Sequence, residues 1–259
     1  MAQKIRIDDL SKAYLPRRGD RVSALEHITL AVEEQEFVTL VGPSGCGKST
    51  LLKIIAGLQP PTSGRVYLDG QSVLAPRRDV GMVFQNPVLL PWRSIMENVL
   101  LPIEILRLER GAYEKTCGQL LELVGLKGFE RRAPRELSGG MQQRAAICRA
   151  LIYNPAVLLM DEPFGALDAM TREELAFELL RIWGEHKKTV IFVTHSITEA
   201  VLLADRVVVM TPRPGRVAAV VNVALPRPRV VDMEFSDTFK GHVDEIRRHI
   251  FARRSEVRA

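Results

Sequence analysis

Residues 37–50 read FVTLVGPSGCGKST, in which the apolar run Phe37–Val41 leads directly into a glycine-rich loop. The glycines let consecutive backbone N–H groups turn toward one point, and the helix expected after the loop adds the positive end of its dipole. A strand, a loop of this kind and a helix together form a phosphate-binding loop. An ordinary glycine-rich turn is the alternative, but it does not require a lysine and a serine in this register. The sequence therefore predicts that a nucleotide is bound by Gly42, Pro43, Ser44, Gly45, Cys46, Gly47, Lys48, Ser49 and Thr50.

Two carboxylates follow a second apolar run. Val157–Met160 reads VLLM, and Asp161 and Glu162 come directly after it. Ligands of open α/β sheets sit at the carboxyl ends of the strands, so these acids are expected beside the phosphate loop. A polar turn is the alternative, and it explains one acid better than two. We expect Asp161 to hold Mg²⁺ and Glu162 to accept a proton from the attacking water as general base. In the same site, Lys48 would bridge the β- and γ-phosphates and Ser49 would ligate Mg²⁺.

A second glycine motif lies further along the chain. Ser138, Gly139 and Gly140 follow Leu137 and open a predicted helix that begins with the residues MQQR. An N-capping serine before a helix is a sufficient structural explanation for this turn. The same turn is also a second anion site, because a helix N-terminus with two glycines allows close approach of a phosphate. The chain would then carry two half-sites for one nucleotide.

The hydrophobic pattern predicts an α/β fold with a mainly parallel sheet. Short apolar runs predict strands at 37–41, 65–68, 80–84, 157–160, 190–193 and 206–210, with a further short strand at 217–223. Between 84 and 157 the pattern changes to helices, at about 94–107, 113–124 and 138–152. We divide the sequence into a core of residues 1–85 and 156–225, an inserted helical subdomain of residues 86–155, and a C-terminal helical tail of residues 226–259.

Composition excludes several classes of protein. The 259 residues are 46% hydrophobic and 26% charged, with a formal net charge of +5, which describes a globular chain rather than a disordered one. The three cysteines form no CxxC pair, which argues against a disulfide framework or a structural zinc site and favours a reducing compartment. The first residues lack an apolar signal segment, and the apolar runs fall short of the about 20 residues that span a bilayer. We therefore expect a protein that does not itself cross the membrane.

With these motifs in their order, the sequence resembles the nucleotide-binding subunits of ABC transporters over nearly its whole length. The LSGG motif at 137–140 with the QQR at 142–144 is the most specific part of the resemblance. The resemblance implies a RecA-like P-loop NTPase core, an N-terminal antiparallel β part, and ATP and Mg²⁺ as ligands. It also implies a head-to-tail dimer of two copies, with the phosphate loop of one copy and Ser138, Gly139 and Gly140 of the other enclosing each ATP. Because both copies use the same surfaces, such an arrangement is complete as a dimer.

The resemblance assigns four further residues. Tyr14 would stack on the adenine, although a lone tyrosine is as often an ordinary core or surface residue. Gln85 would lie between Mg²⁺ and the helical lobe, and a solvated loop amide is its alternative. His195 would contact the γ-phosphate and orient the catalytic water. Asp168 would belong to the loop that crosses the dimer interface, and it also precedes a predicted helix that it could cap.

Two stretches extend the resemblance to a narrower group. LLPWRSIMENV at 89–99 and MTPRPGR at 210–216 resemble the corresponding parts of importers for nitrate, taurine and aliphatic sulfonates. This resemblance implies a membrane permease that docks on the loop after Gln85, an indirectly linked solute-binding protein and a small anion as cargo. It places the chain peripherally on the cytoplasmic face of the inner (plasma) membrane. No cargo-sensing site is expected after Pro226.

Two other functions compete with transport. A soluble ABC-type ATPase acting on nucleic acid or ribosomes would suit the slightly basic balance. Only 90 residues separate Lys48 from Ser138, however, which leaves no room for a long coiled-coil insertion, and a single phosphate loop is present. A phosphotransferase kinase would have no use for the LSGG motif. We therefore expect no nucleic-acid partner.

Overall fold

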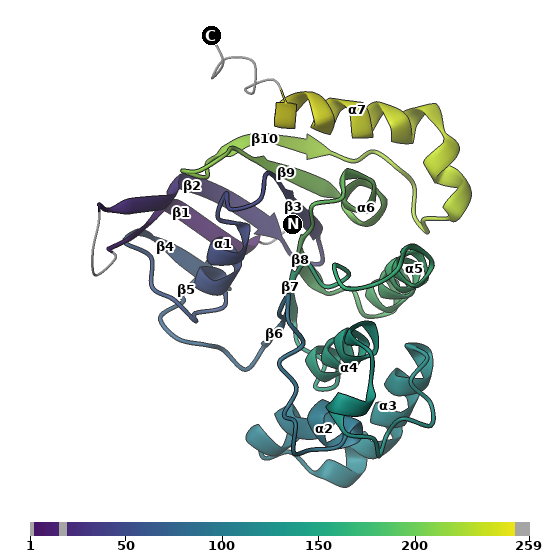
Figure 1. Cartoon of the computed structure of the whole chain (residues 1–259). Coiled ribbons are helices and arrows are strands. Elements are labelled where there is room, and N and C mark those ends of the chain that lie inside the picture. Colours follow the sequence, from purple (N-terminus) through teal and green to yellow (C-terminus); the bar gives the residue numbers. More distant parts are fainter. Residues whose placement is uncertain (1–2, 16–19, 252–259) are drawn as a thin grey trace.

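The computed structural model of the chain describes residues 3–15 and 20–251. Within them the strands form two sheets, an antiparallel one at the N-terminal end and a larger one through the middle of the molecule, and helices flank the larger sheet (Figure 1). The predicted α/β class is confirmed by this arrangement. Among the described residues, no helix combines the length and the apolar character needed to span a membrane.

The six-stranded sheet has the order β10-β9-β3-β8-β7-β6. Its strands are β3 (Phe37–Val41), β6 (Val80–Val83), β7 (Val157–Asp161), β8 (Thr189–Val193), β9 (Arg206–Met210) and β10 (Val217–Asn222). All neighbouring strands are parallel except β10, which runs antiparallel to β9. Every residue of β3, β7 and β8 is buried, as expected for parallel strands that are covered on both faces.

The four-stranded sheet is antiparallel and has the order β2-β1-β4-β5. Its strands are β1 (Gln3–Tyr14), β2 (Val22–Glu33), β4 (Ser63–Leu68) and β5 (Gln71–Ser72). The apolar run at 65–68 was predicted as a strand without an assigned partner, and as β4 it pairs antiparallel with β1. This sheet agrees with the antiparallel N-terminal β part that the family resemblance implied, whereas a short apolar run alone carries no information about the direction of its neighbour.

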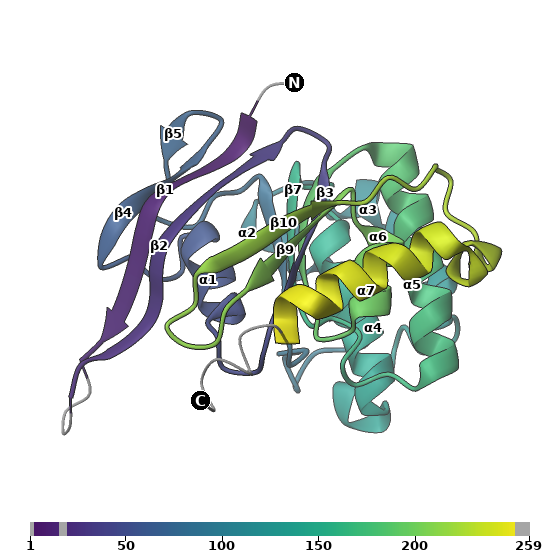
Figure 2. The same cartoon turned by 90° about the horizontal axis from the view of Figure 1, so that it is seen from above.

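The helices occupy two regions around the six-stranded sheet. They are α1 (Lys48–Ile55), α2 (Ile95–Ile105), α3 (Arg110–Leu123), α4 (Gly139–Leu151), α5 (Ala169–His186), α6 (Ile197–Leu203) and α7 (Asp237–Phe251), with short 3₁₀ turns at Pro134–Glu136 and Val231–Phe235. Helices α2, α3 and α4 contact one another at one end of the molecule (Figure 1). Helix α7 lies across β9, β10 and α6, as the view from above shows (Figure 2).

The alternation of side chains along β3 explains why two hydrophobic cores form. Val38 and Leu40 pack with the antiparallel sheet and with α1, whose Leu51 and Leu52 are buried there. Phe37 and Val41 face the opposite core, which contains buried side chains of α2 to α7. Helix α1 is therefore held between the two sheets, and its N-terminus is fixed at the carboxyl end of β3.

Candidate nucleotide site

The glycines of the phosphate loop are required by close contacts. Gly47 has a φ of 104°, and a Cβ there would lie 2.6 Å from Leu25 Cδ2. A Cβ on Gly42 would lie 2.9 Å from the backbone oxygen of Met210. Larger residues at either position would displace the loop from β2 or from the end of β9. The tight curl of the loop therefore depends on neighbours that are distant in sequence.

Lys48 is the first residue of α1, and its side chain folds back over the loop. Its Nζ donates to the backbone oxygens of Gly42 at 2.7 Å and Pro43 at 3.0 Å. Although Lys48 is buried, the ammonium group is thus held at the loop, where the phosphates of a nucleotide would lie. No carboxylate pairs with it among the residues that the structure describes.

Ser49 and Asp161, which were both predicted to hold Mg²⁺, lie in contact. The Ser49 hydroxyl donates to Asp161 Oδ1 at 2.8 Å. Burial raises the pKa of the Asp161 carboxyl, and the hydrogen bond from Ser49 offsets part of that shift. A hydroxyl and a carboxylate in contact beside a phosphate loop suit Mg²⁺, which takes one or two protein oxygens and completes its shell with phosphates and water. Asp161 and Ser49 therefore fit that ion.

Two side chains from other loops contact the carboxylate of Glu162. Gln85 Nε2 donates to Glu162 Oε2 at 3.3 Å, and His195 Nδ1 lies 3.5 Å from the same oxygen. Glu162 itself has a φ of 45°, in a turn where its N–H donates to the backbone oxygen of Val193 at 3.0 Å. A non-glycine residue in this conformation is strained. Two predicted catalytic residues, Gln85 and His195, thus converge on one carboxylate oxygen of a third, Glu162.

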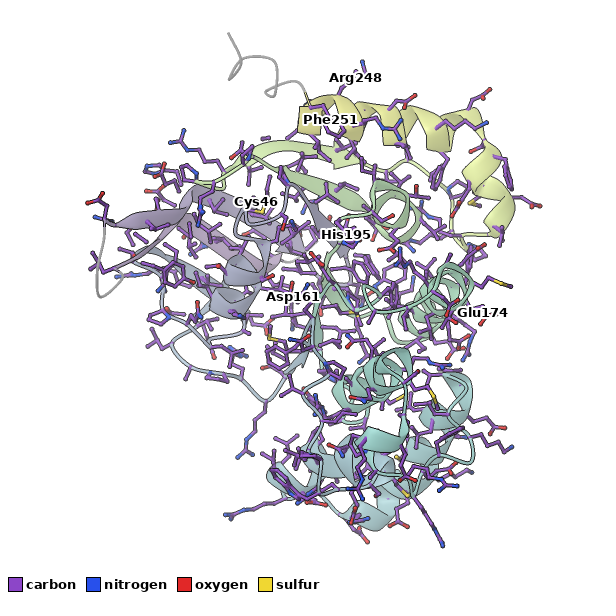
Figure 3. The ribbon with its side chains drawn as sticks, in the orientation of Figure 1. Cys46, Asp161, Glu174, His195, Arg248 and Phe251 are labelled. Carbon is purple, nitrogen blue, oxygen red and sulfur yellow. The ribbon has the colours of Figure 1, made fainter. Side chains whose placement is uncertain are left out.

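Lys48, Ser49, Gln85 and Glu162 line a cleft of about 330 Å³, and Asp161 and His195 contact this lining without being part of it. Figure 3 labels Asp161 and His195 in the central part of the view, and Arg248 and Phe251 on α7 at its upper edge. The lining consists of Tyr14, Ala24, Ser44, Gly45, Gly47, Lys48, Ser49, Thr50, Gln85, Glu162 and Arg213. Tyr14 is 40% exposed, and its hydroxyl donates to Gln59 Oε1 at 3.0 Å and lies 3.4 Å from Thr50 Oγ1. Its ring therefore stands beside the start of α1, where the base of a nucleotide could stack.

The second half-site lies outside this cleft. Ser138 is the exposed N-cap of α4, and its Oγ accepts from the Met141 N–H at 3.3 Å. Asp168 caps α5 in the same way, accepting from the Thr171 N–H at 3.0 Å, and this hydrogen bond lowers the pKa of its carboxyl. The N-terminus of α4 and the loop before α5 are in contact, since a Cβ on Gly140 would lie 3.0 Å from Leu167 Cδ2. Neither Ser138, Gly139, Gly140 nor Asp168 lines the cleft around the phosphate loop.

Sequence reasoning missed two residues that line the cleft. Ala24 on β2 and Arg213 in the β9–β10 turn carry no motif that marks them as nucleotide neighbours. Cys46 was predicted to bind the nucleotide, but it does not line the cleft and its side chain is completely buried. Burial raises the pKa of the Cys46 thiol.

Comparison with known proteins identifies the family. Residues 25–165, more than half of the chain, match the family model described as ABC transporter. The chain belongs to the ABC transporter family. The predicted resemblance and the ATPase class are thereby confirmed, and this ABC protein carries its phosphate loop, its LSGG motif and Asp161 and Glu162 inside the matched residues.

The relatives of this ABC protein include named import subunits. It is 45% identical to the aliphatic sulfonates import ATP-binding protein SsuB of Bacillus cereus, over 89% of this chain and 90% of that one. It is 48% identical to the taurine import ATP-binding protein TauB of Rhizobium johnstonii, with coverage of 83% and 82%. It is 47% identical to the nitrate import ATP-binding protein NrtD of Synechococcus elongatus, with coverage of 87% and 83%.

A solved structure confirms the fold of the ABC cassette. A dimeric ATP-binding cassette in a post-hydrolysis state, bound to ADP and phosphate, matches with a TM-score of 0.78 and 34% sequence identity. The match covers 86% of this chain and 100% of that one. The protein is therefore an ABC-type ATPase with the core architecture that the sequence predicted.

Proposed function

We propose that this chain is the ATP-hydrolysing subunit of an ABC importer for a small anion such as nitrate, taurine or an aliphatic sulfonate. The observation that carries the proposal is that Ser49, Gln85 and Glu162 line one cleft with the phosphate loop. Asp161 and His195 contact this lining, through Ser49 and Glu162 respectively. The named sulfonate, taurine and nitrate import relatives support the cargo class. The importers' cargo would not touch this chain, which supplies only the energy.

In the proposed reaction, water attacks the γ-phosphorus of ATP and the bond to the β-phosphate oxygen breaks, giving ADP and phosphate. Glu162 accepts the proton of the attacking water, and His195 and Gln85 orient that water and the carboxylate. Lys48 leaves the backbone oxygens of Gly42 and Pro43 to contact the phosphates. Mg²⁺, when held by Ser49, Asp161 and Gln85, supplies charge neutralisation for the phosphates.

The proposed working form is a head-to-tail dimer. Ser138, Gly139 and Gly140 are accessible at the N-terminus of α4 but lie outside the cleft of their own chain, so a second copy would have to bring them to the nucleotide. Asp168 would lie at the same interface, because residues 166–167 contact Gly140. Binding of ATP then favours association and hydrolysis favours release, which converts chemical energy into movement.

The proposed permease surface is an apolar groove of about 470 Å³ next to α2. Its apolar lining includes Met82, Phe84, Val88, Leu101, Pro102 and Ile105. Val88 and Ile105 are 61% and 68% exposed, and Arg149 fixes the neighbouring loop by donating to the backbone oxygens of Pro87 and Val88. A short helix on the cytoplasmic side of a permease would bury this surface. Residues 86–155 would then move with the permease as the helical subdomain, and the protein would sit peripherally on the cytoplasmic face of the membrane.

Affinity purification of the tagged full chain from detergent-solubilised membranes of its source cells, followed by mass spectrometry, tests the proposal. We expect a multi-span permease at near-equal stoichiometry. Ile105→Asp in the groove should abolish that capture, whereas Leu74→Asp, at an exposed site outside the groove, should not. Recovery of ribosomes or nucleic acid in place of a permease would support the alternative function and contradict transport.

A further inference from the structure

The turn between β9 and β10 carries two arginines in different surroundings. Arg216 Nη2 donates to Glu26 Oε2 at 2.6 Å, which ties one guanidinium group to β2. Arg213 is exposed, and its side chain makes no hydrogen bond or ion pair with any residue that the structure describes. Yet Arg213 is the one of the two that lines the cleft around the phosphate loop. The turn therefore presents an unpaired cation to this cleft.

The turn is fixed against the phosphate loop by its backbone. The Gly215 N–H donates to the Ala24 oxygen at 2.9 Å, and the Glu26 N–H donates to the Gly215 oxygen at 3.0 Å. A Cβ on Gly215 would lie 2.0 Å from the backbone oxygen of Cys46, so the turn and the loop are in direct contact there. Within the turn, Thr211 Oγ1 donates to the Pro214 oxygen at 3.1 Å and accepts from the Arg216 N–H at 2.9 Å. Arg213 is thus carried by a backbone that is held in place beside the nucleotide site.

The charges around the cleft favour an additional phosphate contact. Lys48 and Arg213 are the cations in its lining, and Glu162 is the carboxylate. A triphosphate carries more negative charge than Lys48 alone can neutralise. The planar guanidinium of arginine suits phosphate oxygens, because it donates two parallel hydrogen bonds.

We propose that Arg213 binds the phosphate chain of the nucleotide, from the side of the β9–β10 turn. This inference rests on the proposed nucleotide site and adds to it a residue that lies 165 positions after Lys48 in the sequence. The alternative role for a guanidinium beside Tyr14 is stacking on the base, which would not depend on phosphate.

The experiment compares the affinities of the full chain for ATP and for adenosine by calorimetric titration. Arg213→Gln should weaken ATP binding about tenfold, the size expected for a partly exposed charge-assisted contact, and should leave adenosine binding unchanged. Arg213→Lys, which keeps the charge but loses the planar fork, should recover part of the lost affinity. Arg216→Gln, in the same turn but paired with Glu26, serves as the matched control and should bind ATP like the wild type.

The outcomes separate this inference from the nucleotide site on which it rests. If Lys48→Ala loses ATP affinity while Arg213→Gln keeps it, the site stands and the role of Arg213 is wrong. Unchanged ATP binding by Lys48→Ala would reject the site itself. Equal losses for ATP and adenosine in Arg213→Gln would also overturn the inference, by showing stacking or a distorted cleft. Thermal unfolding of each variant checks folding, and a folded Arg213→Lys that recovers no affinity counts against the phosphate contact.

Discussion

Glu162 combines a strained backbone with two side-chain neighbours, and both features are set by residues distant in sequence. Its N–H is held by Val193, and its Oε2 faces Gln85 and His195. Asp161, one residue earlier, points instead to Ser49. The two adjacent carboxylates at this strand end therefore have different neighbours, which suits the separate roles proposed for them.

Replacement of Glu162 by Gln should separate ATP binding from hydrolysis. The amide keeps the size of the side chain and a partner for Gln85 but cannot accept the proton, so hydrolysis should fall by about 100-fold or more. Phosphate release measures hydrolysis, and titration with a fluorescent ATP analogue measures binding, which should remain. Glu174→Gln, on the exposed face of α5, is the matched control (Figure 3). Hydrolysis at the wild-type rate in Glu162→Gln would reject the general-base role.

Cys46 should react slowly with alkylating reagents although it lies within the phosphate loop. Its thiol is fully buried, and burial raises its pKa above the ordinary value, as it also raises the pKa of Cys117 to about 11. Because the thiolate is the reactive form, little reaction is expected in the folded protein between pH 7 and 9, and the rate should rise only at higher pH. Mass spectrometry after iodoacetamide treatment measures it, and the guanidinium-unfolded chain is the control. Rapid modification of folded Cys46 would mean that the loop opens more readily than its contacts indicate.

At the scale of elements, buried parallel strands were the most predictable part of the fold. Phe37–Val41 and Arg206–Met210 were placed with their observed bounds, because strands covered on both faces form continuous apolar runs. Individual bounds for β1 and β2 were not predicted. In those strands apolar residues are interrupted by polar ones, and the two strands pair through several register shifts. The sequence therefore lacks the continuous apolar run that marks a buried strand. The position of Arg213 at the cleft could not be predicted from the sequence either, because it depends on the backbone hydrogen bond from Gly215 to Ala24, which is distant in sequence.

Asn98 stabilises the loop that precedes α2, and its removal should weaken the whole domain. The buried amide accepts from the Leu90 N–H at 2.7 Å and donates to the backbone oxygens of Leu90, Arg93 and Ser94. Asn98→Ala would leave these groups without their partner, at a cost of about 2 kcal/mol in the free energy of unfolding. Urea unfolding measures this cost, and Asn86→Ala, at an exposed asparagine in the same segment, should change little. An equal effect of the two substitutions would mean that the hydrogen bonds of Asn98 do not hold the loop.

At the scale of the whole molecule, Ser138 lies outside the cleft of its own chain, and the proposed head-to-tail dimer would complete each site with the Ser138 of a second copy. In the Glu162→Gln background, ATP should convert the monomer into a stable dimer, because the nucleotide is bound but not hydrolysed. Adding Ser138→Arg places a bulky cation at the N-terminus of α4, where it opposes both the helix dipole and close approach of the partner's phosphate loop. The double variant should still bind ATP but remain monomeric.

Size-exclusion chromatography with light scattering measures the mass of each variant with ATP. Ser72→Arg in the same background, at an exposed residue of β5, is the matched control that should still dimerise. A dimer that forms equally well with Ser138→Arg would show that the LSGG motif does not face the nucleotide of the second copy. Because binding and association are measured separately on one folded chain, loss of the dimer with intact ATP binding assigns Ser138 to the interface and not to the monomer's cleft.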